Sequence, residues 1–355
     1  MKVAVGLSGG VDSTLAAALL REAGHDVVGV TMTLGRADEA ASLAAARKAA
    51  AHLGVPLKVF DFADAWRKHV LGYLRSSLLA GETPNPCVAC NEAVKLGLLP
   101  QAAFAWGAER FATGHYARLE RAPGGEVRLL RGVDRRKDQS YFLYRVAADV
   151  LARTLLPLGG YTKDEVRALA RERGLAASEQ PDSQDFCGGD PRAVVTEAPR
   201  PGDVVGTDGR VLGRHRGFWQ HTVGQRKGLG IGGGVPFYVV RLDAERNQVV
   251  VGTRAEAVSA GFRVRDVVVR AAAALDGRPL AVKVRSAGEP RGPVAVAWNA
   301  AGTELEVEAG EGFPVVAPGQ SAVFFAGDEV VAGGVIAGGG GDRESGNFKT
   351  KEMNR

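Results

Sequence analysis

The amino-acid sequence predicts an α/β protein in which a doubly wound parallel sheet is followed by a small β-rich module and a C-terminal β-barrel. Helical and strand patterns alternate over the first 62 residues, whereas short β-branched runs separated by turn residues replace them beyond Pro191. Further short strands recur from about residue 263. With 355 residues, of which 45% are hydrophobic, the chain can form two or three domains with their own cores.

The first part alternates strands and helices in the order expected for a parallel sheet. A strand pattern over 2–7 leads through a glycine-rich turn into a helix over 12–24, whose apolar residues recur at helical spacing. A strand over 25–34, a helix over 38–54 and a strand over 56–62 follow. Because helices separate successive apolar strands, we expect helices on both faces of the sheet.

The same alternation resumes further along the chain. The sequence predicts a helix over 91–108, a strand over 110–116 and a helix over 161–174. Thr162 and Glu165 have the spacing of a capping box, in which each side chain binds a backbone N–H of the first helical turn. We expect this capped helix to complete the core of the first domain.

Strand patterns dominate the remaining sequence. The segment 235–252 contains two β-branched runs joined by hairpin-turn residues. The later strands have the short, regular spacing of a barrel or a sandwich. We place the domains at 1–192, 193–255 and 256–338, and expect the tail 339–355 to be disordered because it has no apolar periodicity.

Charge and hydropathy exclude a membrane protein. No stretch approaches 18 uninterrupted apolar residues, and the first residues enter a strand pattern without the features of a signal peptide. We therefore expect a soluble, cytoplasmic monomer. The net charge of +5 and pI near 9.2 permit a polyanionic partner without requiring one.

A glycine-rich loop, Ser8-Gly9-Gly10-Val11-Asp12-Ser13, lies between the first strand and the first helix. Backbone N–H groups and the helix dipole make an anion site at such a position. The loop lacks the lysine of a Walker A motif. It resembles the PP-loop of ATP pyrophosphatases, which cleave ATP to AMP and pyrophosphate. The alternative, a tight turn with a polar helix cap, is disfavoured because all six residues match.

The sequence contains three cysteines, Cys87, Cys90 and Cys187. Structural disulfides are rare in cytosolic proteins, so this odd number favours catalysis or metal binding. The segment GETPNPCVACN at 81–91, followed by Lys95, resembles the catalytic loop of the tRNA-specific 2-thiouridylases of the bacterial MnmA family. Further segments match this family in order, namely ATGHY (112–116), KDQSYFL (137–143), SQDFC (183–187) and GQRKGL (224–229).

The chain is identified by this resemblance as a member of the MnmA family over residues 6 to about 325. The resemblance implies an ATP site formed by the loop and by the ends of later strands, where such sheets bind ligands. The implied ATP-binding residues are Gly6, Leu7, Ser8, Gly9, Gly10, Val11, Asp12, Ser13, Met32 and Gly114. Asp12 is expected to orient Mg²⁺ or pyrophosphate. The alternatives to nucleotide contact are a core-filling side chain for Met32 and a turn glycine for Gly114.

The resemblance also implies the reaction. The O2 atom of the wobble uridine of tRNA would attack the α-phosphate of ATP, which makes C2 electrophilic, and sulfur would then displace AMP. Cys187 would carry sulfane sulfur as a persulfide, supplied by a cysteine desulfurase or a sulfur carrier protein. Cys90 would act as the nucleophile that releases the sulfur by forming a disulfide bond with Cys187.

The sequence departs from the common family pattern at Cys87, where an aspartate is usual. Cys87, Cys90 and Cys187 would make a three-thiolate set for a [4Fe–4S] cluster, whose open iron could bind free sulfide. A redox-silent Cys87 is the alternative to the cluster, and a zinc site would need one more soft ligand. Persulfide transfer and cluster chemistry therefore stand as two alternatives.

A wobble base must leave its stack before an enzyme can reach C2, and splayed loop bases are readily bound by proteins. The residues that resemble tRNA-contact positions of the family are Asn85, Pro86, Cys87, His115, Lys137, Asp138, Gln139, Arg285 and Gln320. An ordinary surface role is the alternative for Arg285 and Gln320, and a hydrogen-bonded histidine beside the sheet is the alternative for His115.

Two other functions are weighed against tRNA thiolation. Another PP-loop ATP pyrophosphatase, such as an amidotransferase or a ligase, would adenylate a small molecule, but the cysteine-bearing loops and the added β domains argue against it. A non-catalytic RNA-binding module is disfavoured by the complete six-residue loop and the retained cysteines.

Overall fold

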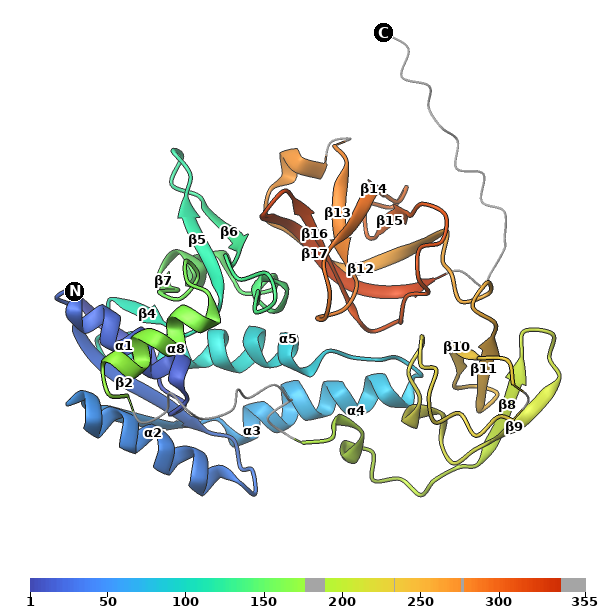
Figure 1. The fold of residues 1–355 in the computed structure, drawn as a ribbon, viewed down its shortest axis with the longest axis horizontal. Helices are drawn as coiled ribbons and strands as arrows, with labels where there is room; N and C mark the ends of the chain where they lie inside the picture. The colour runs from blue at the N-terminus through green and yellow to red at the C-terminus, as the bar shows by residue number, and fades with distance from the viewer. Residues whose placement is uncertain (176–188, 233, 276–277, 340–355) are drawn as a thin grey trace, which may run out of the picture.

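The computed structural model describes residues 1–175, 189–232, 234–275 and 278–339. Its first part contains a parallel sheet with the strand order β3-β2-β1-β4-β7 (Figure 1). The strands are Lys2–Gly6 (β1), Asp26–Thr33 (β2), Leu57–Asp61 (β3), Arg110–Ala112 (β4) and Thr154–Leu155 (β7). The predicted parallel sheet is therefore confirmed.

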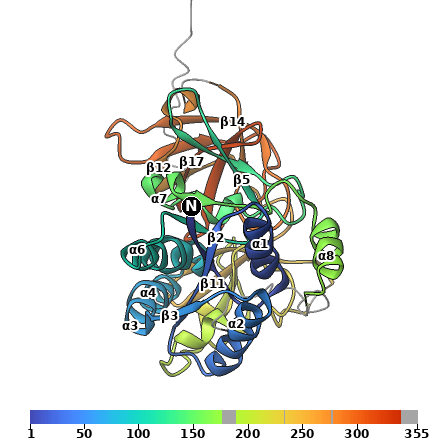
Figure 2. The same ribbon diagram turned by 90° about the vertical axis from the view of Figure 1, so that its left-hand side faces the viewer.

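Helices cover both faces of this sheet (Figure 2). On one face, Val3 and Val5 pack against Val11–Glu22 (α1), Glu39–Leu53 (α2) and Lys163–Glu172 (α8). Ala4, between them, points to the opposite core, because successive side chains of a strand alternate between faces. The remaining helical segments of the first part are Ala63–Trp66 (α3), Arg67–Leu71 (η1), Gly72–Leu79 (α4), Pro86–Cys90 (α5), Asn91–Leu98 (η2), Leu99–Ala105 (α6), Ser140–Phe142 (η3) and Ala148–Ala152 (α7).

The strand order creates a switch point between β1 and β4. The chain passes from β1 outward through β2 and β3, and then returns to the other side of β1 as β4. The loops that follow β1 and β4 therefore diverge at the centre of the sheet, where such folds bind ligands. The strand predicted over 110–116 ends at Ala112, because residues 113–116 turn toward the start of α1.

A small module follows, with the strand order β10-β11-β8-β9. Its strands are Gly202–Gly206 (β8), Val211–His215 (β9), Tyr238–Asp243 (β10) and Gln248–Gly252 (β11), and its 3₁₀ turns are Pro191–Val194 (η4) and Phe218–Gln220 (η5). The predicted hairpin is confirmed, because β10 and β11 pair antiparallel around a turn in which Asn247 has φ 53°. Leu74 and Leu78 of α4 pack into the core of this module.

The last part is an antiparallel barrel, as predicted. Its strands run in the order β12-β15-β14-β13-β16-β17, and pairing between β12 and β17 closes the barrel. They are Gly261–Val269 (β12), Leu280–Lys283 (β13), Arg291–Trp298 (β14), Leu305–Glu308 (β15), Ser321–Ala326 (β16) and Glu329–Gly339 (β17), with a 3₁₀ turn at Ala272–Leu275 (η6).

A hairpin of the first part lies against this barrel and was not predicted. Ala117–Arg121 (β5) and Val127–Arg131 (β6) pair antiparallel, and Leu130 of β6 pairs with Glu329 of β17. The barrel is thus anchored directly to the domain that contains the parallel sheet.

Some predictions fall outside the described residues. Cys187, the segment 183–187 and the predicted tail beyond Gly339 lie there. Among the residues that the structure describes, no helix is long and apolar enough to cross a membrane.

Candidate active site

The glycine-rich loop joins β1 to α1 in a tight turn. Gly9 has φ +82°, and a Cβ atom there would lie 2.4 Å from the backbone carbon of Ala45 in α2. Ser13 Oγ accepts a hydrogen bond from Ser8 N at 3.2 Å and donates to Gly10 O at 3.2 Å. The loop is therefore shaped by a left-handed glycine, close packing of α2, and one hydroxyl that ties its two ends together.

The N-terminus of α1 opens toward this loop. Its N-cap is Gly10, which has no side chain to bind the N–H groups of the first turn. These N–H groups and the positive end of the helix dipole favour an anion. The anion site that the sequence predicts would therefore lie where β1 and α1 meet.

A buried lysine that the sequence analysis missed lies beside this loop. Lys163 Nζ lies 2.7 Å and 2.9 Å from the two carboxylate oxygens of Asp12, and Tyr116 donates its hydroxyl to Asp12 Oδ1 at 2.7 Å. The Lys163 side chain is 5% exposed. One signal was present in the sequence: Lys163 occupies the first position of a helix, where the dipole disfavours a cation unless an acidic partner lies nearby.

The loop after β4 approaches the same turn. A Cβ atom on Gly114 would lie 2.7 Å from the backbone carbon of Asp12 and 2.8 Å from Ser13 N. Only glycine allows this approach without displacing the start of α1. Gly114 is therefore a close-packing residue at the switch point, and its contact with ATP stays a prediction.

His115 follows Gly114 and is buried, with Nδ1 2.8 Å from Thr113 Oγ1. Burial, together with the positive charge of Lys95, lowers the pKa of His115 to about 3. The imidazole is therefore neutral at physiological pH and bonded within the protein, which agrees with the alternative of a hydrogen-bonded histidine. A tRNA contact of His115 stays a prediction.

This burial predicts a loss of stability in acid. His115 binds a proton near pH 6.5 when unfolded but only near pH 3 when folded, so its neutral form stabilises the fold fully above pH 6.5 and progressively less below. Between pH 7 and pH 5, the free energy of unfolding should fall by about 2 kcal/mol more in the wild type than in His115→Gln. Urea unfolding of both proteins measures this difference, and equal pH dependence would contradict it.

The cysteine loop forms the start of a long helical segment. Asn85 caps α5 by accepting a hydrogen bond from Val88 N at 3.2 Å, and Pro86 occupies the first helical position. The helix predicted over 91–108 therefore begins at Pro86 and continues through the π-helical segment η2 into α6. Cys87 and Cys90, three residues apart on α5, lie on the same side of the helix.

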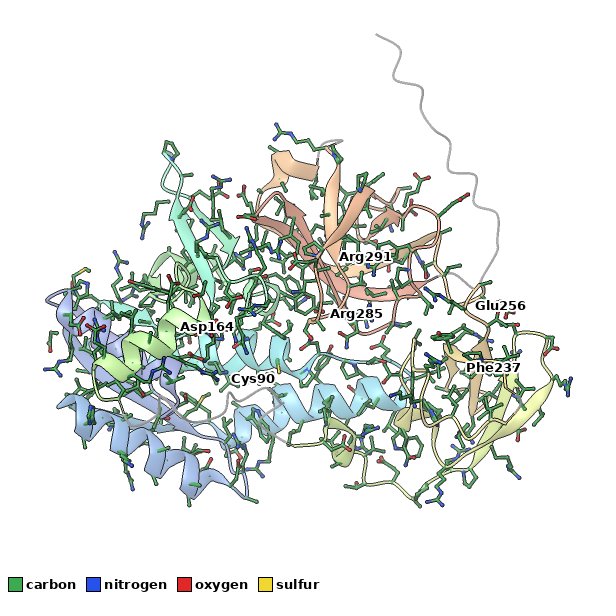
Figure 3. The ribbon with its side chains drawn as sticks, viewed as in Figure 1. Cys90, Asp164, Phe237, Glu256, Arg285 and Arg291 are labelled. Atoms are coloured by element: carbon green, nitrogen blue, oxygen red, sulfur yellow. The ribbon has the colours of Figure 1, made fainter. Side chains whose placement is uncertain are left out.

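Cys90 lies near the carboxyl edge of the sheet (Figure 3). It is 5% exposed and packs in an apolar cluster with Leu34, Trp66 and Val94, against which Met32 also packs. Met32 is thus a core residue beside Cys90, and its contact with ATP stays a prediction. Neither Cys87 nor Cys90 forms a disulfide with another described residue.

The predicted tRNA-contact residues occupy different environments. The Asp138 carboxylate is fully buried and accepts hydrogen bonds from Gly132 N and Ser140 N at 3.0 Å and 3.1 Å. The Gln139 side chain accepts a hydrogen bond from Tyr116 N at 2.9 Å, and Gln139 N donates one to Tyr116 O at 2.8 Å. These two side chains are bonded within the protein, so they hold the turn that presents the half-buried Lys137.

The two predicted contact residues of the barrel also differ. Arg285 is exposed on the barrel (Figure 3). Gln320 instead donates its amide to the carbonyl oxygen of Thr83, in the loop before α5, at 2.9 Å. The fold thus brings together Asp12, Ser13, Gly114 and Lys163. It also brings the barrel into contact with the cysteine loop.

Family profiles match the chain in three consecutive parts. A profile described as "tRNA methyl transferase HUP domain" matches residues 1–188. Profiles described as "tRNA methyl transferase PRC-barrel domain" and "Aminomethyltransferase beta-barrel domain" match residues 194–253 and 258–336.

Curated relatives cover almost the whole chain. The protein named tRNA-specific 2-thiouridylase MnmA from Chloroflexus aurantiacus is 44% identical over 353 residues, which is 94% of this chain and 98% of that relative. The protein of the same name from Methylorubrum populi is 44% identical over 94% of this chain and 93% of its own length. That from Roseiflexus sp. is 42% identical over 95% of this chain and 99% of its own length. The chain therefore belongs to the MnmA family of tRNA-specific 2-thiouridylases.

Proposed function

We propose that this chain is a tRNA-uridine 2-sulfurtransferase, which uses ATP to place sulfur on C2 of the wobble uridine. The observation that carries the proposal is that the glycine-rich loop follows β1, while Cys90 packs beside Leu34, which follows the neighbouring strand β2, at the same edge of the sheet. The chain also belongs to this family. The small module and the barrel, at 193–255 and 256–338, would bind the tRNA.

The first step would take place at the switch point. The N–H groups at the start of α1 bind the phosphates of ATP, and Lys163 supplies positive charge as pyrophosphate leaves. Uridine O2 attacks the α-phosphate, so the O–P bond forms as the bond to pyrophosphate breaks. Asp12, whose side chain is 33% exposed, would hold a Mg²⁺ ion, which would neutralise negative charge of the nucleotide. Among the described residues, no group of three His, Cys, Asp or Glu side chains could hold a metal by itself.

The second step would transfer sulfur to C2 and release AMP. In the persulfide route, the terminal sulfur on Cys187 would attack C2 and displace AMP. The Cys90 thiolate would then attack Cys187 Sγ and break its bond to the transferred sulfur, which stays on C2, and an external thiol would reduce the Cys90–Cys187 disulfide. In the cluster route, Cys87, Cys90 and Cys187 would hold a [4Fe–4S] cluster, whose open iron would supply a site for sulfide. Cys87 and Cys90 on one helical turn suit either route.

Mass spectrometry of nucleosides tests this function. After incubation of tRNA with the protein, ATP and a sulfur source, either a cysteine desulfurase with cysteine or free sulfide, digestion of the tRNA should yield 2-thiouridine, and the reaction mixture should contain pyrophosphate. A matched tRNA with cytidine at the wobble position should yield neither. AMP formation that does not depend on tRNA would instead favour adenylation of a small molecule, and release of orthophosphate as the first product would exclude the PP-loop reaction.

A further inference from the structure

The barrel makes direct backbone contact with the loop that precedes the cysteine helix. Thr83 N donates to Pro318 O at 2.7 Å, and Gln320 Nε2 donates back to Thr83 O at 2.9 Å. Beside them, Arg265 of β12 pairs with Glu82 at 2.7 Å. Two hydrogen bonds and one ion pair therefore hold residues 82–83 against one end of the barrel.

Gly319 lies between the two hydrogen-bonding residues and allows this contact. A Cβ atom at Gly319 would lie 2.7 Å from Glu82 Cβ and 2.9 Å from Thr83 N. Its φ of +86° also favours glycine. Any side chain at Gly319 would push the loop away from the barrel.

A second connection reaches the cap of the cysteine helix. Tyr141, which is fully buried, donates its hydroxyl to Ser321 O at 3.0 Å and lies beside the side chain of Asn85. Asn85 in turn caps α5. The barrel therefore supports both ends of the short loop 82–85, from which the helix with Cys87 and Cys90 begins.

We propose that the segment Pro318–Ser321, the barrel clamp, positions the cysteine helix for the chemical step, with Gly319 and Gln320 as positioning residues. Reacting groups must be held close to their productive geometry, and a loop alone does so poorly. Gln320 would therefore position the loop through the hydrogen bond from its amide to Thr83 O, in addition to any contact that it makes with tRNA. The catalytic consequence rests on the proposed function, whereas the positioning itself is a property of the protein without substrate.

Gly319→Ala, compared with Gly327→Ala, tests the clamp. Both glycines lie in the barrel part of the chain with positive φ, but a Cβ atom at Gly327 would meet nothing within 4 Å. In the protein without tRNA, amide hydrogen exchange of residues 83–88 should accelerate in Gly319→Ala and remain unchanged in Gly327→Ala. The kcat for thiolation should fall by about 10- to 100-fold in Gly319→Ala, with KM for ATP and tRNA unchanged.

Gln320→Glu provides a second test that keeps the size of the side chain. The carboxylate cannot donate to Thr83 O, so exchange of residues 83–88 should also accelerate without tRNA. Unchanged exchange in both Gly319→Ala and Gln320→Glu would overturn the clamp, as would a higher KM for tRNA at wild-type kcat. If exchange is faster in the two variants but the wild-type protein itself thiolates no tRNA, the clamp would be supported and the proposed function refuted.

Discussion

Cys90→Ala is expected to abolish tRNA thiolation while pyrophosphate release in a single turnover continues. In the proposed mechanism, adenylation of uridine O2 uses the PP-loop, whereas sulfur release needs the Cys90 thiolate, so only the second step should stop. Loss of a nucleophile reduces turnover on the order of 10⁴-fold or more, which here means a fall to background. Single-turnover assays of pyrophosphate and of 2-thiouridine in the same sample separate the two steps.

Substitution of the neighbouring cysteine distinguishes the two sulfur routes. In the persulfide route, Cys87→Asp should keep substantial activity without iron, because Cys90 and Cys187 carry the sulfur between them. In the cluster route, anaerobic reconstitution should give a chromophore that Cys87→Ala, Cys90→Ala and Cys187→Ala all remove, together with thiolation from free sulfide. An active, iron-free Cys87→Asp protein would contradict an essential cluster, and an inactive one that folds and binds ATP would contradict the persulfide route.

Ser13→Ala and Asp12→Asn are each expected to reduce tRNA-dependent pyrophosphate formation by about 10²- to 10³-fold. Ser13 Oγ ties Ser8 N to Gly10 O, and Asp12 holds Lys163 beside the anion site. Either change would disturb groups that should stabilise charge in the transition state. Quench-flow measurement of pyrophosphate in the presence of tRNA gives the rate, and wild-type rates in both variants would refute the nucleotide site.

The structure also gives Asp12 a role in the stability of the fold. Lys163 is buried against Asp12, and removing one partner of a fully buried pair costs about 3–5 kcal/mol, less here because Asp12 is partly exposed. The double variant Asp12→Asn, Lys163→Met should recover stability but not activity. Recovery of activity in the double variant would show that Asp12 acts only on the fold.

The sequence by itself determined the order and type of most elements, because their signals are local. Apolar spacing identified β1, α1, β2, α2 and β3 as a parallel set, and the capping box at Thr162 and Glu165 forms as predicted. Turn residues identified the hairpin between β10 and β11. The cysteine helix begins earlier than predicted, since the polar cap Asn85 and the proline that follows it precede the apolar pattern. The strand predicted over 110–116 ends at Ala112, and the hairpin of β5 and β6 was not predicted.

Tertiary structure alone decided which distant residues share a site. Lys163 and Asp12 are 151 positions apart, and Gln320 and Thr83 are 237 positions apart, so no periodicity or turn signal relates them. The burial of His115 likewise depends on how the loop after β4 packs. The spacing of apolar residues shows only which residues share a face of one helix or strand. The packing of α1 against α8, and of the barrel against the cysteine loop, depends on the whole chain.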